Sequence, residues 1–186
     1  MAGPYFSRTW ATFVYQGTSY TLAHLDEYEF VIEDTAHCQR RIAVTFADHC
    51  FTRSPVSGDD PALAYPHSDR KPGYFCFERY KLTFELQKHL EYAAKGEVWT
   101  VAGQHFAAVP IVDQSGKRIC YGIVFSLDRV TGLPVDLHLR VRTAYPMHRE
   151  MVTFGAVRFR NLVALRMKNK RPGRITSPGR RRPKSP

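Results

Sequence analysis

The hydrophobic and polar positions of this chain alternate with a period of two over several short segments. Residues 9–25 hold two aromatic-rich runs on either side of a glycine, which is typical of a β-hairpin. Residues 27–34 and 40–47 continue the pattern, and the second has an apolar side chain at every other position from Ile42 to Phe46. Because alternate side chains of a strand point to opposite faces, these segments predict an N-terminal antiparallel sheet.

The pattern changes in the middle of the chain. Residues 52–73 contain four prolines among glycine, serine and aspartate, which predicts a long surface loop. Loops longer than about 12 to 15 residues are usually functional or disordered, so this one is a candidate lid. In residues 77–96, leucines recur four positions apart and a glycine follows the last turn. This segment predicts the main helix of the fold, with its aromatic side chains packed in the core.

The remainder of the chain returns to strand-like sequence. Residues 152–167 fit a strand or a helix equally well, and the clearer strand-like runs are residues 97–103, 105–113, 118–128 and 135–145. The fold class that we predict is therefore α+β: a predominantly antiparallel sheet, open or barrel-like, with one main helix. A chain of 186 residues has the size of one domain, which we place at residues 1–168.

The positive charge of the chain is concentrated at its C-terminus. The formal net charge is +10, yet residues 158–186 contain eleven Lys and Arg and no Asp or Glu, so the remainder is close to neutral. Residues 169–186 also lack aromatic side chains and are rich in proline, glycine and serine, which predicts a disordered basic tail. The apolar fraction of 44% indicates that the rest of the chain folds.

Features that the sequence lacks argue against several classes of protein. Without a signal peptide or an apolar stretch of roughly 20 residues, we expect a cytoplasmic protein with reduced thiols and no membrane association. GxGxxG, GxSxG and HExxH are absent from the sequence, so we expect no cofactor. His37-Cys38 and His49-Cys50 contain metal-binding residue types. A strand between them, rising about 3.3 Å per residue, would hold the pairs apart, which favours buried thiols over a metal site.

Residues 137–151, LHLRVRTAYPMHREM, combine arginine, histidine, threonine and tyrosine at the end of a predicted strand. Strand parity places the leucines and valines of residues 135–141 on the buried face. His138, Arg140 and Arg142 then form a cationic stripe on the other face. Like charges two positions apart repel, so the stripe calls for an anion opposite it, either a carboxylate of the protein or a phosphate.

Pro146 directs the chain away from the strand. Its ring disfavours helix at the preceding residue, so Thr143, Tyr145 and His148 are expected to project near the strand end. A metal-free ribonuclease needs a histidine for proton transfer, cations on the phosphate and a hydroxyl donor to its non-bridging oxygens. The residue types at this strand end fit that chemistry.

The same stretch resembles a known group of proteins. Residues 125–146, FSLDRVTGLPVDLHLRVRTAYP, are similar to the C-terminal half of the barnase, EndoU, colicin and RelE-like small ribonuclease toxins, many of which carry a Ser/Thr-x-Tyr/Phe-Pro motif on a late strand. The resemblance implies that Thr143 and Tyr145 belong to the motif and that Arg142 lies beside it. The chain is also similar to small bacterial and mobile-element proteins with a late TAYP segment and an early HCF(T) segment, which here begins at His49.

The segment FADHCFTR would supply the second part of such a site. His49 is the candidate general acid or base, because histidine has an unperturbed pKa of about 6.5. Arg53 is the candidate phosphate clamp, because its guanidinium is planar and permanently charged. In the alternative interpretation Asp48 and His49 only close a strand end, while Cys50 and Phe51 pack inward.

Three functions follow from these observations. The first is a metal-independent endoribonuclease that acts on RNA, either as a toxin or as a stress-related factor of mobile-element origin. Its catalytic residues would be His49, Arg53, Arg142, Thr143 and Tyr145, and a neutralising protein partner is expected in the case of a toxin. The second is a non-catalytic nucleic-acid-binding module that acts through the basic tail. For contacts with nucleic acid in either case we select His138, Arg140, His148, Arg149, Lys168, Lys170 and Arg171. The third is a partner-binding domain with an aromatic N-terminal edge.

Overall fold

The computed structural model describes residues 5–6, 9–66, 73–101, 104–112, 116–147 and 154–170. In this part of the chain the strands are β1 (Phe13–Tyr15), β2 (Thr18–Tyr20), β3 (Tyr28–Glu33), β4 (Gln39–Phe46), β5 (Thr52–Arg53), β6 (Ala64–Tyr65), β7 (Gly73–Phe75), β8 (Glu97–Val101), β9 (Gln104–Val112), β10 (Arg118–Arg129), β11 (Leu137–Met147) and β12 (Phe154–Arg158). The α-helices are α1 (Phe77–Thr83), α2 (Leu86–Ala93) and α3 (Phe159–Met167), and the 3₁₀ turns are η1 (Ala23–Leu25), η2 (Asp48–Cys50) and η3 (Pro61–Leu63).

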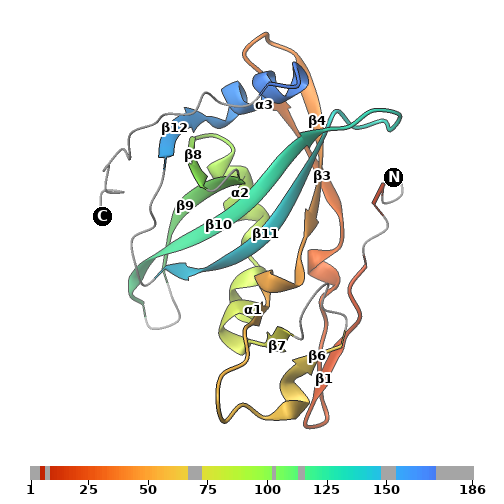
Figure 1. The fold of residues 1–186 in the computed structure, drawn as a ribbon, viewed down its shortest axis with the longest axis vertical. Helices are drawn as coiled ribbons and strands as arrows, with labels where there is room; N and C mark the ends of the chain where they lie inside the picture. The colour runs from red at the N-terminus through yellow and green to blue at the C-terminus, as the bar shows by residue number, and fades with distance from the viewer. Residues whose placement is uncertain are drawn as a thin grey trace.

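A seven-stranded sheet forms the centre of the fold (Figure 1), with the strand order β12-β8-β9-β10-β11-β4-β3. Neighbouring strands are antiparallel except β11 and β4, which run parallel with Leu139 opposite Val44. The parallel pair ends at Val141 and Phe46, so the last part of β11 continues beyond β4. Because the two edge strands do not pair with each other within the described residues, the sheet is open.

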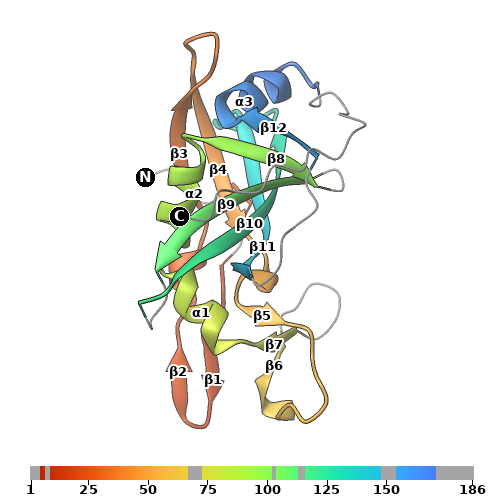
Figure 2. The ribbon, with the colours of Figure 1, turned by 90° about the vertical axis from the view of Figure 1, so that its left-hand side faces the viewer.

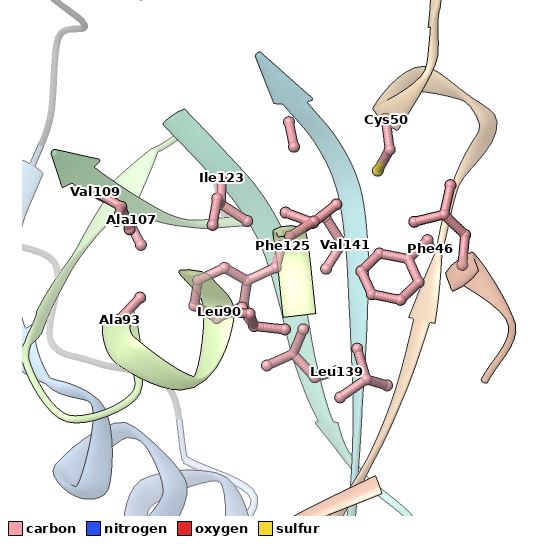
Figure 3. Packing of buried hydrophobic residues seen from close by; sticks show 14 of the residues in the cluster. Phe46, Cys50, Leu90, Ala93, Ala107, Val109, Ile123, Phe125, Leu139 and Val141 are labelled. Carbon is pink, nitrogen blue, oxygen red and sulfur yellow. The ribbon is translucent and has the colours of Figure 1, made fainter. Parts of the chain in front are cut away.

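The core of the sheet is covered by α2 and α3. Leu86, Leu90 and Ala93 recur on one side of α2 and are buried, as expected for an amphipathic helix. Figure 3 shows Leu90 beside Phe125 of β10, with Ala93 facing the next strand. On α3, the ring of Phe159 lies 6.0 Å from that of Phe125. Each leucine buried in this way contributes about 1.5–3 kcal/mol to the stability of the fold.

Short strands and aromatic rings build the other end of the molecule. β1 pairs with β2, and β7 lies between β5 and β6. The rings of Phe13 and Phe75 stack at 4.3 Å, and Trp10 meets Phe51 edge-on at 5.0 Å. These side chains belong to one hydrophobic cluster with the residues of the large sheet. In both views this end lies opposite α3, with α1 between it and the sheet (Figures 1 and 2).

The α+β class predicted from the sequence is confirmed, and the sheet is open rather than barrel-like. The prediction of one main helix is wrong, because residues 77–96 contain two helices and α3 is a third. The break falls at Glu85, whose φ of −102° and ψ of 2° are not helical. It allows Tyr80 to pack against the ring of Phe75 while Leu86 faces the sheet.

For three other segments, the sequence leaves the structure open or predicts an irregular one. Residues 152–167, which fit a strand or a helix, form both in succession: β12 and then α3. The long loop expected at residues 52–73 contains β5, η3 and β6, while residues 67–72 lie outside the described residues. The predicted disordered tail lies outside them from Arg171 onward. No helix in the described part of the chain is both long enough and apolar enough to cross a membrane.

Candidate functional site

A β-bulge near the end of β11 gathers its polar side chains on one face of the sheet. The pairing of β10 with β11 shifts by one residue at Arg142, which has no partner position. The buried residues are odd-numbered up to Val141 and even-numbered from Ala144 onward. Arg142, Thr143 and Tyr145 therefore lie on the half-buried side, together with the stripe that parity predicted.

The η2 turn ends β4 and lies against the extension of β11. Cys50 and Phe51 are fully buried, as the alternative interpretation of this segment expected, whereas His49 is exposed. The hydroxyl of Thr143 donates a 3.2 Å hydrogen bond to the carbonyl oxygen of His49. Two of the predicted catalytic residues, 94 positions apart in the sequence, are thus brought into contact.

Arg79 of α1 is a further member of this cluster. Its Nη1 donates hydrogen bonds to the carbonyl oxygens of His49 at 2.9 Å and Thr52 at 2.7 Å. Its guanidinium carbon lies 5.6 Å from the ring centre of Tyr145, which is a cation–π distance. Sequence analysis did not identify Arg79, because a single arginine in a helical segment carries no local signal of a site.

The charge of Arg79 acts on two phenols. Burial raises the pKa of Tyr145, and the positive charge of Arg79 opposes this effect without cancelling it. Burial also raises the pKa of Tyr121, which is fully buried on β10, and Arg79 again opposes the change. Both phenols are therefore protonated near neutral pH, and the half-buried Tyr145 presents a hydroxyl donor at the end of β11.

Arg53 makes its contacts within its own loop. Its guanidinium donates to both carboxylate oxygens of Asp59, one of them at 2.7 Å, and to the carbonyl oxygen of Ser54 at 3.0 Å. The pairing lowers the pKa of Asp59 to about 2. This carboxylate compensates the positive charge of Arg53, which weakens its attraction for a second anion. Its role as a phosphate clamp stays a prediction.

His138, the first residue of the cationic stripe on β11, contacts side chains from other parts of the protein. The Nε2 of His138 and the hydroxyl of Thr45 are 2.8 Å apart, and the imidazole stacks on Phe6 with ring centres 3.8 Å apart. Asp128 lies directly opposite His138 on β10. Burial lowers the pKa of His138, and the carboxylate of Glu27 opposes the shift. Two carboxylates of the protein, those of Glu27 and Asp128, therefore lie close enough to His138 to act on its charge.

The other described residues predicted to bind nucleic acid are Arg140, Lys168 and Lys170. Arg140 occupies the next stripe position, between Ser126 of β10 and Thr45 of β4. Lys168 and Lys170 follow α3, at the opposite end of the sheet from α1 (Figures 1 and 2). Three members of the set fall outside the described residues: His148, Arg149 and Arg171.

The two His-Cys dipeptides lie at opposite ends of β4, which is a single strand between them, as expected. Within the described residues, no group of three His, Cys, Asp or Glu side chains is arranged to hold a metal ion. The four cysteines all lie in the described part of the chain and form no disulfide there: Cys38, Cys50, Cys76 and Cys120. Cys50 is fully buried beside Phe46 in the core (Figure 3).

Comparison with known proteins places most of the chain in one family. No curated protein and no solved structure matches the chain. Residues 12–167, however, match the YjaZ family. The match runs from β1 to the end of α3 and includes η2, α1 and β11, which form the candidate site. The chain therefore belongs to the YjaZ family.

Proposed function

We propose that this protein is a metal-independent endoribonuclease whose active site lies at the end of β11. The observation that carries the proposal is the contact of Thr143 and Arg79 with the carbonyl oxygen of His49. These bonds join an exposed histidine to the Thr-Ala-Tyr-Pro segment. The resemblance of that segment to the motif of small ribonuclease toxins is the second support.

His49 is the residue that transfers protons in this proposal. Acting as a general base, its imidazole takes the proton of a ribose 2′-hydroxyl, and the 2′-oxygen attacks the adjacent phosphorus. The bond from phosphorus to the 5′-oxygen breaks, and the leaving oxygen takes a proton from water. The products are a 2′,3′-cyclic phosphate and a 5′-hydroxyl. General acid–base catalysis of this kind contributes about 10²–10⁴-fold to a rate.

Arg142 and Tyr145 stabilise the charge that develops during the attack. Negative charge accumulates on the non-bridging oxygens of the phosphate, and Arg142 supplies a permanent positive charge on the same face of the sheet as Tyr145. Because the pKa of Tyr145 is raised, its phenol stays protonated and donates a hydrogen bond to these oxygens. A donor of this type contributes about 10²–10³-fold to the rate in other enzymes.

The first test is incubation of purified protein with total RNA in EDTA. Wild type is compared with the double variant His49→Ala, Tyr145→Phe and with His37→Ala, a matched control that removes another exposed histidine. His37 lies beyond the far end of β4, where its Nδ1 pairs with Glu33 at 2.8 Å. We expect wild type and the control to cleave RNA to cyclic-phosphate ends, and the double variant to leave it intact. Equal cleavage by all three, or by none, contradicts the proposal.

A second candidate function is nucleic-acid binding without catalysis. The observation in its favour is the group of eleven Lys and Arg residues from Arg158 onward, which suffices to neutralise phosphates along a nucleic acid. Deletion of residues 169–186 then removes most of the affinity and flattens its dependence on salt. Unchanged binding by the truncated protein rules this function out.

The biological setting belongs to the same proposal. A ribonuclease with this site would be a cytoplasmic toxin of mobile-element type, held inactive by a neutralising protein partner. Expression of the wild-type protein is then expected to stop bacterial growth, while the double variant His49→Ala, Tyr145→Phe is tolerated. Normal growth with wild-type protein present at the level of the variant contradicts the toxin role.

A further inference from the structure

The guanidinium of Arg79 is only partly used by the contacts of the site. Both hydrogens of its Nη1 group are directed to carbonyl oxygens, one of His49 and one of Thr52. Within the described residues, neither Nε nor Nη2 of this side chain has a hydrogen-bond partner. Their N–H groups form the other edge of the planar fork, which matches two oxygens of a phosphate.

The position of Arg79 keeps this edge both fixed and accessible. Two hydrogen bonds hold one side of the guanidinium, and the ring of Tyr145 lies against it. The residue is half-buried, so part of the side chain remains open to solvent. A donor pair that is already oriented loses less entropy on binding than a mobile surface arginine does.

The other arginines near the site differ from Arg79 in how their guanidinium groups are anchored and paired. Arg53 has both of its amino groups bound to Asp59, and its positive charge is compensated. Arg142 lies on the bulge of β11, and no contact within the described residues fixes its guanidinium. Among these three, Arg79 combines an anchored side with a positive charge that no carboxylate of the described residues is seen to pair with.

We propose that Arg79 is the phosphate-binding arginine of this protein: Nε and Nη2 bind two oxygens of a phosphate mono- or diester, while Nη1 holds the His49 turn. The inference rests on the proposed function in taking that phosphate to be the scissile group of RNA. Because one rigid group contacts both the turn and the phosphate, it sets the distance between His49 and the bound phosphate. Lysine, with a single ammonium on a flexible stem, cannot do both.

The test follows the side-chain Nε–H signal of Arg79 by NMR while inorganic phosphate is added, and then while an uncleavable oligonucleotide of 2′-deoxyribose is added. The signal is assigned through the bonds of the side chain and by its loss in Arg79→Lys. We expect it to shift in the wild-type protein with both probes. Arg79→Lys is expected to bind each probe about tenfold more weakly, because the paired donors are lost.

Arg41→Lys is the matched control, since its guanidinium is bound to Glu29 near the start of β4, away from the η2 turn that follows the end of this strand. Its affinity for both probes should stay within about twofold of wild type. Circular dichroism checks that the variants are folded, and the wild-type titration alone decides the question if Arg79→Lys unfolds. An Arg79 signal that does not move, or a shift confined to Arg53 or Arg142, overturns the inference.

These outcomes separate the inference from the proposed function. If the Arg79 signal shifts but RNA stays intact, the phosphate site stands and the ribonuclease proposal fails. If RNA is cleaved while the Arg79 signal is unmoved and Arg79→Lys keeps its full rate, the ribonuclease stands and the inference fails. If both hold, Arg79→Lys should raise the KM for RNA and lower kcat, because it affects both the phosphate and the position of His49.

Discussion

The first half of β11, residues 137–141, runs between β10 and β4, whereas the second half, residues 143–147, extends past the end of β4. In the first half, His138 contacts Thr45 of the neighbouring strand and is covered by Phe6. In the second half, Thr143 and Tyr145 contact η2 and α1 instead. One strand therefore supplies polar side chains first to the sheet and then to a cluster of loop and helix residues.

This difference shows why composition alone is a poor guide to the position of a site. Histidine and arginine occur in the first half, where neighbouring strands occupy both edges and Asp128 lies opposite the stripe. Within the described residues, no strand pairs with one edge of the second half, and the η2 turn meets it there. Sites made from loops at the end of a rigid strand are common, because the strand positions the side chains and the loop leaves them accessible.

The largest effect is expected from Leu139→Ala in the first half. Leu139 is completely buried, and its loss leaves a cavity that should lower the free energy of unfolding by about 2–5 kcal/mol. RNA cleavage per folded molecule should not change. Urea denaturation and cleavage assays on the same sample check both statements. A loss of cleavage larger than the loss of folded protein would contradict the division of β11 into two halves.

Gly73→Ala is expected to have the next largest effect on stability, and it acts on the residues around η2 and α1 that contact the second half of β11. A Cβ at this position would lie 2.7 Å from the hydroxyl oxygen of Thr52, whose carbonyl accepts a hydrogen bond from Arg79. We expect the free energy of unfolding to fall by about 1–3 kcal/mol and RNA cleavage to be reduced. The control is Gly96→Ala, where the nearest atom is 3.7 Å away and thermal unfolding should change little. Equal effects of both variants would contradict the close approach.

Smaller effects on stability are expected from Thr143→Val and Thr45→Val, which should differ in their effect on RNA cleavage. Each replaces a hydroxyl by a methyl and removes one side-chain hydrogen bond, to His49 or to His138 respectively. Each should cost about 1 kcal/mol of stability. Only Thr143→Val should lower cleavage, by about tenfold, because it releases the η2 turn. Urea denaturation and the rate of RNA cleavage give the two readouts, and a similar loss of cleavage in Thr45→Val would remove the distinction.

The smallest effect is the change of stability with pH that the titration of His138 causes. Burial lowers its pKa in the folded protein, so the unfolded chain takes up a proton first as the pH falls. The stability that His138 contributes is complete above about pH 6.5 and is lost as the pH falls from there through the folded pKa. His138→Gln should show a shallower loss of Tm than wild type between about pH 7 and pH 5. If Tm falls equally with pH in His138→Gln and in wild type, the pKa of His138 is the same in the folded and unfolded states.

Local patterns predicted much of the fold but only part of the site. The strand predicted at residues 135–145 is observed as β11 at residues 137–147, and its leucines and valines are buried as alternation predicted. The expectation that Pro146 turns the chain past the strand end was wrong, because Pro146 lies within β11 and pairs with Tyr121. The split at Glu85 was missed, because leucines four positions apart are compatible with one helix or with two. Arg79 was missed because its partners are 27 and 30 residues away. The pairing of Arg53 with Asp59 was missed for a different reason: the prolines and glycine nearby indicated only a loop.

The sequence by itself determined which residues alternate between the two faces of the strands, because that alternation is a property of each strand alone. It also located the histidine and the Thr-Ala-Tyr-Pro segment that form the candidate site. Only the tertiary structure decided that they meet. The bulge at Arg142 arises from pairing with β10 and reverses the alternation, so Thr143 and Tyr145 leave the core face. The end of β4 then leaves an edge of β11 for the η2 turn, where Arg79 from α1 joins the three segments.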